Sequence, residues 1–339
     1  MKLQPQVAHG ASGVGVAASP LVKVDPERYG SLVHPGDDYS YEMFTQAALV
    51  LRHPGAVDPL GGLTAARLIG DGESQSAFRM VTYVDAIQPV RRAFDGFFIH
   101  SRSSGSTPLA APADAGIAGF ASGPTPAHIR GDLAVPVLQF ETETDLLLLG
   151  FSAARQPDAA GLRTWEVAGT AHADQYLLDY ESNLATDAGA SDAGSLSIPC
   201  SGVNAGPEHW VVNTALNAIH TWVKAGQAPA SGTPLTLADA GSAFAQDAYG
   251  NALGGVRTAA VDVPIATYSG QGDGSNVICE LFGTTTPFSS TQLATLYSSH
   301  DDYVAKVTAA TVKSQQAGFI LPADAPLIEE EAQSAPVPQ

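Results

Sequence analysis

One short segment, residues 68–77, constrains the fold more than any other. An aliphatic run ends there in small residues, and a helix-forming stretch begins immediately after Ser74. Gly72 lies two residues before this serine and Ser76 two residues after it. A strand-to-helix turn this tight is crowded, so both positions must be small, and the serine between them is pushed outward. The usual pattern has glycine at the second position, where Ser76 is small enough to fit. The segment predicts a nucleophile elbow with Ser74 at its tip, the alternative being a serine that only caps a helix.

Two later segments supply an acid and a histidine in the order that such a serine requires. Residues 135–140 form an apolar run typical of a buried strand, and they lead into Glu141, Glu143 and Asp145. Residues 162–168 also have the pattern of a strand, and they lead into His172. Serine, acid and histidine in this chain order are the triad order of α/β-hydrolases.

The chemistry assigns a role to each candidate. A serine hydroxyl needs a neighbouring base to remove its proton, and His172 is expected to be that base. A carboxylate then orients the imidazole and stabilises its charged form. Asp145 lies nine residues after Pro136, a spacing similar to that seen in many α/β-hydrolases, so it is the preferred acid. Glu143 and, less favourably, Glu141 are the alternatives.

The oxyanion hole is expected to use the backbone N–H of Gln75, the residue after the nucleophile. A second N–H normally comes from a loop far upstream. Residues 9–13 resemble such a loop superficially, although an ordinary glycine-rich connector explains them better.

Composition bounds the remaining possibilities. The chain has 339 residues, of which 45% are hydrophobic, so it can bury a large core. A net charge of −18 argues against nucleic-acid binding, which needs a surplus of basic residues. No apolar run approaches the roughly 18 residues of a membrane span, and the N-terminus lacks the apolar core of a signal peptide. The expected location is therefore cytoplasmic by default, with no metal, no cofactor and no membrane partner; oligomeric state is left open.

Cys200 and Cys279 are the only cysteines. Two thiols in a chain of this size are more often buried and reduced than bridged, so free thiols are expected.

The pattern along the chain predicts an α/β core over residues 1–226, with an insertion or cap at about 103–130. An extension over 227–327 is expected to pack on this core, and residues 328–339 are expected to form a flexible tail. The same pattern predicts a helix over 41–51, the elbow strand over 66–70, a helix over 75–87, a closing helix over 212–223, a glycine-rich flexible loop over 270–274, a strand over 261–265 and one long helix over 293–307.

These motifs together resemble a bacterial family of α/β-hydrolase-domain proteins. The matching stretches span nearly the whole chain: residues 25–32, 34–37, 72–77, 141–145, 169–174 and 254–257. The resemblance implies an α/β-hydrolase fold, with a mostly parallel sheet and helices on both faces. Family members carry further residues upstream, including the first strands and an oxyanion loop. The resemblance therefore also implies an N-terminally short chain, with consequences for activity.

The residues favour a serine hydrolase that cleaves a small-molecule carboxylic ester through an acyl-enzyme on Ser74. Amides, thioesters and lactones are cleaved by the same triad. A catalytically degenerate binding protein with this fold is the main alternative. A dinucleotide-dependent oxidoreductase fits less well: Gly70 and Gly72 mimic the start of its glycine fingerprint, but Gln75 occupies the third glycine position.

Overall fold

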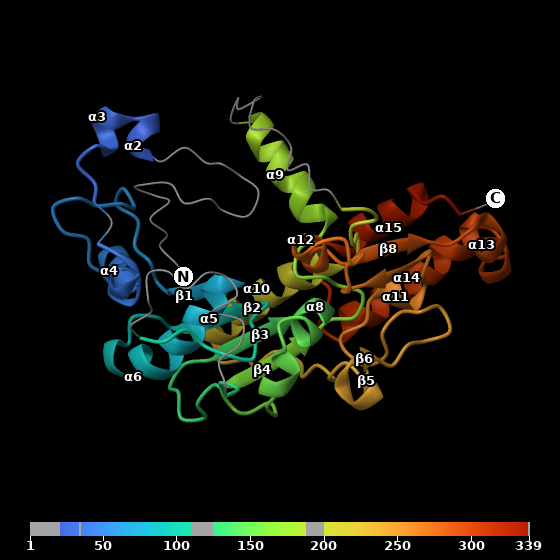
Figure 1. Ribbon diagram of the computed structural model, residues 1–339, viewed down its shortest axis with the longest axis horizontal. Coiled ribbons are helices and arrows are strands. Elements are labelled where there is room, and N and C mark those ends of the chain that lie inside the picture. The colour runs from blue at the N-terminus through green and yellow to red at the C-terminus, as the bar shows by residue number, and fades with distance from the viewer. Residues whose placement is uncertain (1–20, 34, 110–124, 188–199, 338–339) are drawn as a thin grey trace. The chain divides into compact units, whose positions relative to one another are not determined.

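The computed structural model describes residues 21–33, 35–109, 125–187 and 200–337 (Figure 1). It divides into two compact units. The first comprises residues 1–137, 149–162 and 223–226, and the second comprises residues 138–148, 163–222 and 227–339. This division differs from the expected boundary at residue 226, because the segments that carry the candidate acid and histidine belong to the same unit as the C-terminal region.

The first unit contains the nucleophile segment and the helices around it. Its elements are α2 (Leu21–Val24), α3 (Pro26–Tyr29), η1 (Asp37–Tyr39), α4 (Ser40–Arg52), β1 (Ile69–Glu73), α5 (Gln75–Thr82), the π-helical turn η2 (Tyr83–Ile87), α6 (Gln88–Arg91), β2 (Gly96–His100) and η3 (Phe151–Ala154). The predicted helices over 41–51 and 75–87 are confirmed. The elbow strand begins three residues later than expected.

The central sheet has four strands in the order β1-β2-β3-β4. Strand β3 covers Val137–Glu141 and β4 covers Leu162–Glu166, and both pass from the first unit into the second. Strands β1 and β2 pair in parallel, with Ile69 opposite Gly96 and Glu73 opposite His100. Because parallel strands end at the same edge, the segments that follow β1 and β2 leave the sheet side by side.

An aromatic cluster fills the core of the first unit. Phe44 of α4 stacks on Phe94 with ring centroids 4.6 Å apart, and Tyr83 meets Phe44 edge-on at 5.2 Å. Phe97 of β2 is fully buried and lies 5.5 Å from Phe94. Burial of large aromatic rings is among the strongest packing contributions available. This cluster fixes α4 against the strand that neighbours the elbow.

The second unit carries the ends of β3 and β4 and most of the remaining helices. Its elements are α8 (Glu143–Leu147), α9 (Gln175–Asp187), α10 (Glu208–Ala225), β5 (Leu237–Ala238), η4 (Asp239–Gly241), β6 (Ala243–Phe244), α11 (Ala259–Asp262), β7 (Ala266–Ser269), α12 (Val277–Leu281), β8 (Thr284–Pro287), α13 (Ser290–Leu296), α14 (His300–Gln316) and α15 (Ala325–Ser334). Helix α10 confirms the predicted closing helix, although its last three residues belong to the first unit.

Three expectations for the C-terminal region were wrong. Residues 261–265 do not form a strand: the short helix α11 ends at Asp262, and Pro264, which lacks a backbone N–H, precedes β7. The single helix over 293–307 is two helices, because Ser299 caps a new one by accepting a hydrogen bond from Asp302 N. In place of a tail from residue 328, α15 packs beside α14 (Figure 1), where Ala332 is buried with Tyr303 and Val307.

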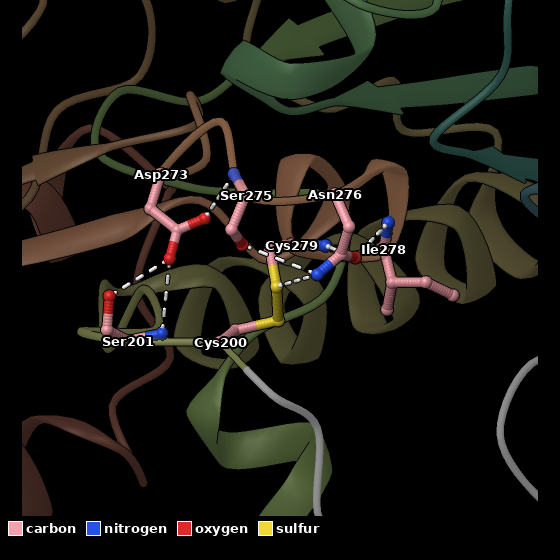
Figure 2. The surroundings of a disulfide bond; sticks show 7 residues. All are labelled: Cys200, Ser201, Asp273, Ser275, Asn276, Ile278 and Cys279. Carbon is pink, nitrogen blue, oxygen red and sulfur yellow. Dashed lines mark hydrogen bonds between the residues drawn. A yellow bond between two sulfur atoms is a disulfide. The ribbon is translucent and has the colours of Figure 1, made fainter.

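The two cysteines form a disulfide, which corrects the expectation of free thiols. Cys200 and Cys279 have their Cα atoms 5.3 Å apart (Figure 2). Neighbouring hydrogen bonds order the same region: Asn276 caps α12, and Asp273 accepts a bond from the Ser201 hydroxyl at 2.9 Å. The pairing was not predictable, because the cysteines are separated by 79 positions. Within the residues described, no helix is both long enough and apolar enough to cross a bilayer.

Candidate active site

Ser74 occupies the turn between β1 and α5 in a strained conformation. Its φ of 55° and ψ of −123° lie outside the regions that L-residues prefer. The backbone on both sides is fixed, because Ser74 N donates to His100 O at 3.0 Å and Phe78 N donates to Ser74 O at 3.2 Å. Strain of this kind persists only where the surroundings enforce it, and it is concentrated at functional sites.

Close packing explains the small residues around Ser74. A Cβ atom on Gly72 would lie 2.9 Å from the carbonyl oxygen of Ser76, closer than such atoms approach in folded proteins. The strand therefore meets the first turn of α5 at a distance that only glycine allows. Ser76 takes the position that usually holds glycine and is the second residue of α5.

Gln75 is the first residue of α5. The first N–H groups of a helix have no hydrogen-bond partner within the helix, and they form the positive end of the helix dipole. They are therefore well placed to stabilise a developing oxyanion. The expected role of the Gln75 N–H is consistent with this location and stays a prediction. The upstream loop at residues 9–13 lies outside the described residues, as does the centre of the insertion expected at 103–130.

In the second unit, His172 is bonded to Asp145. Nδ1 of His172 lies 2.7 Å from Oδ1 of Asp145, and both side chains are buried. The other carboxylate oxygen, Oδ2, accepts hydrogen bonds from the backbone N–H and the hydroxyl of Thr142 at 2.7 and 2.6 Å. Thr142 and Asp145 form a reciprocal capping box at the start of α8. One carboxylate oxygen of Asp145 is thus held by Thr142 at the start of α8, and the other contacts the imidazole of His172.

The carboxylate of Glu143 contacts backbone N–H groups and not the imidazole of His172. It accepts hydrogen bonds from Gly169 N at 2.6 Å and from Gly270 N at 2.9 Å. Burial raises the pKa of Glu143 to about 7, against the opposing effects of these two N–H donors and of Arg257. Glu143 therefore connects the turn before His172 to the segment after β7, and the structure places it against backbone rather than against the imidazole.

Thr144, between the two acids, fixes the histidine backbone. Its hydroxyl donates to Gly270 O at 2.6 Å and accepts from His172 N at 3.1 Å. A Cβ on Gly270 would lie 2.5 Å from both Thr144 N and Glu143 Cβ, so no side chain fits there. The expectation of a flexible loop at 270–274 missed this role. Nothing local in the glycine-rich pattern distinguishes close packing from flexibility.

Glu141, the third candidate acid, ends β3 and is fully buried. Its backbone oxygen accepts a hydrogen bond from Val167 N at 2.9 Å, which pairs β3 with the end of β4. The structure thus brings Asp145 and His172 together in the second unit, whereas Ser74 and Gln75 belong to the first. Among the residues that the structure describes, no group of three or more His, Cys, Asp or Glu side chains is placed to hold a metal ion.

A serine at a strained strand-to-helix turn beside a parallel strand, in a chain that also pairs a histidine with an aspartate, defines an α/β protein of the hydrolase class. The family model described as "Alpha/beta hydrolase domain" matches residues 6–330, so the chain belongs to this family and has its fold. Comparisons with curated proteins and with solved structures gave no significant match.

Proposed function

We propose that the protein is a serine hydrolase that cleaves carboxylic esters through an acyl-enzyme on Ser74. The observation that carries the proposal is the 2.7 Å contact between His172 Nδ1 and Asp145 Oδ1. A buried carboxylate on Nδ1 fixes the tautomer in which Nε2 is free of its proton and can act as a base.

The steps follow from the roles of the three side chains. Ser74 Oγ attacks the ester carbonyl as His172 removes its proton, and the carbonyl oxygen becomes an oxyanion. The Gln75 N–H, at the start of α5, stabilises that charge. His172 then protonates the leaving alcohol, and the acyl group stays on Ser74. A water molecule, deprotonated by His172, attacks the acyl-enzyme. His172 returns that proton to Ser74 Oγ as the acyl–oxygen bond breaks and the acid is released, and Asp145 stabilises the imidazolium formed at each stage.

The strain at Ser74 supports the same reading. With φ at 55°, the serine is held at the tip of a turn that Gly72 makes possible and that a helix-capping role does not require. Serine N-caps ordinarily have extended backbone and accept a hydrogen bond from the helix, whereas Ser74 makes no side-chain capping bond to α5. The turn therefore does not use the hydroxyl to cap the helix.

A fluorophosphonate probe and an aryl ester test the proposal directly. We expect the probe to label Ser74, and we expect Ser74→Ala to abolish both labelling and ester turnover. Ser76→Ala is the matched control: it removes a hydroxyl two residues away and keeps a small side chain in the turn. Unchanged turnover in Ser74→Ala would refute the nucleophile assignment. Absence of labelling in a folded wild-type protein would favour a degenerate binding protein with this fold.

A further inference from the structure

The second unit contains a cavity of about 290 Å³ whose lining includes neither His172 nor Asp145. Its walls come from α10, α11, α14 and α15, with Tyr268 from β7. Most of the lining is apolar. A cavity of this size accommodates a small organic molecule.

Two buried hydroxyls line this cavity without a protein partner. Thr258, just before α11, is 3% exposed, and Thr311 of α14 is 1% exposed. The Oγ1 atoms of both side chains are buried and make no hydrogen bond to any described residue. A buried hydroxyl without a partner costs about 1–3 kcal/mol, so such groups in native proteins mark places where something else supplies the bond. Both residues line the same cavity, so one ligand in it can reach both hydroxyls.

The lining of the cavity also includes aromatic and acidic side chains. Trp210, Tyr268 and Glu331 all belong to its lining. Burial raises the pKa of Glu331, and the negative charge of Glu331 adds to the effect of burial in raising the pKa of Tyr268. Glu331 therefore shares the lining of this cavity with two aromatic side chains.

The charges of the lining residues select the ligand. Glu331 is the only acidic residue among them, and no Lys or Arg lines the cavity. His209 also lines the cavity, and burial lowers its pKa to about 4, so it is neutral at ordinary pH. An anionic ligand would meet uncompensated repulsion from Glu331, whereas an organic cation would gain from the carboxylate and from the ring faces.

We propose that this cavity binds a small organic cation, with its ammonium group at Glu331, Trp210 and Tyr268 and a polar group bonded to Thr258 and Thr311. The proposal does not depend on the hydrolase assignment, since none of these residues belongs to the triad. It defines a second ligand site on the protein.

Choline and its uncharged carbon isostere, dimethylbutanol, test the proposal by calorimetric titration of the full chain. Both probes carry a hydroxyl and a branched head of similar shape, and only choline is charged. We expect choline to bind about tenfold more tightly, within the range of measured cation–π stabilisation. Equal affinities, or no saturable binding of choline, would overturn the proposal and leave a cavity occupied by solvent.

Three substitutions locate the binding. Glu331→Gln is expected to reduce choline affinity toward that of the isostere and to leave the isostere's affinity unchanged, whereas Glu330→Gln, the same change at the neighbouring residue outside the cavity, is expected to leave both unchanged. Thr311→Val should weaken both probes similarly, and it should leave the free protein equally stable or more stable, because it replaces an unpartnered hydroxyl by a methyl group. If Glu330→Gln and Glu331→Gln have the same effect, the cation is attracted by general surface charge and the site is wrong.

Discussion

Glu143 and Asp145 are two residues apart in α8, yet their carboxylates bind different partners. Asp145 contacts the His172 imidazole at 2.7 Å, and Glu143 accepts two backbone N–H groups that flank the histidine turn. One acid is placed to act on the imidazole, and the other holds the chain that carries it. This separation leads to different expectations for substitutions that look alike in sequence.

Asp145→Asn should be far more damaging to catalysis than Glu143→Gln. An amide at position 145 can place an N–H against His172 Nδ1, which forces the wrong tautomer, and loss of the triad acid in this way typically costs about 10⁴-fold in kcat. Glu143→Gln should change kcat much less, because its contacts are to backbone. Aryl-ester turnover of the two folded variants decides the ranking, and the reverse order would transfer the acid role to Glu143.

Glu143 should also make the stability of the protein depend on pH. Burial raises its pKa from 4.5 to about 7 in the folded state, so the folded protein binds the proton more tightly than the unfolded chain. Its contribution to stability is therefore complete below about pH 4.5 and is lost as pH rises through 7, by an amount on the order of 3 kcal/mol.

Denaturant unfolding of wild type and Glu143→Gln at several pH values measures this effect. The wild type should lose stability relative to the variant as pH rises from about 5 to 8. The neighbouring ionisable side chains Asp145, His172 and Arg257 are present in both proteins, so the difference between them isolates Glu143. A difference that grows in favour of wild type with rising pH would mean that the two backbone N–H donors keep Glu143 ionised.

Gly72→Ala should distort the nucleophile turn. The added Cβ would lie 2.9 Å from Ser76 O, and crowding of this kind typically costs about 1–3 kcal/mol. We expect lower stability and reduced fluorophosphonate labelling at Ser74. Gly131→Ala is the control, because nothing lies within 4 Å of its added Cβ. Equal behaviour of the two variants would show that the strand and helix can separate without consequence.

Removing the disulfide should destabilise the second unit. Cys200 and Cys279 are separated by 79 positions, and crosslinking a loop of that length stabilises by about 4 kcal/mol in the chain-entropy description. Replacing both cysteines with alanine should lower the free energy of unfolding by about this amount. A reducing agent should do the same to wild type and have no effect on the double variant. Wild type that is insensitive to reduction would indicate unpaired thiols. Such bonds persist mainly in oxidising compartments.

Local sequence was sufficient where local sterics decide the structure. The turn at Ser74 follows from the small residues at 72 and 76, and α4 and α10 follow from their helical spacing. It was insufficient where helices begin and end by capping. Ser299 starts a new helix by accepting one hydrogen bond from Asp302 N. The apolar spacing continues without interruption across this position, so it does not indicate that one helix ends and another begins.

The sequence by itself determined the fold class, the order of serine, acid and histidine, and the three carboxylates that compete for the middle role. Those features depend on residue types at strand ends, which are readable over a few positions. Only the tertiary structure decided that Asp145 meets His172 and that Glu143 bonds to Gly270, 127 positions away. It also decided that Cys200 pairs with Cys279. Side chains two residues apart leave a helix in different directions, and what each one meets depends on segments brought close only when the chain has folded.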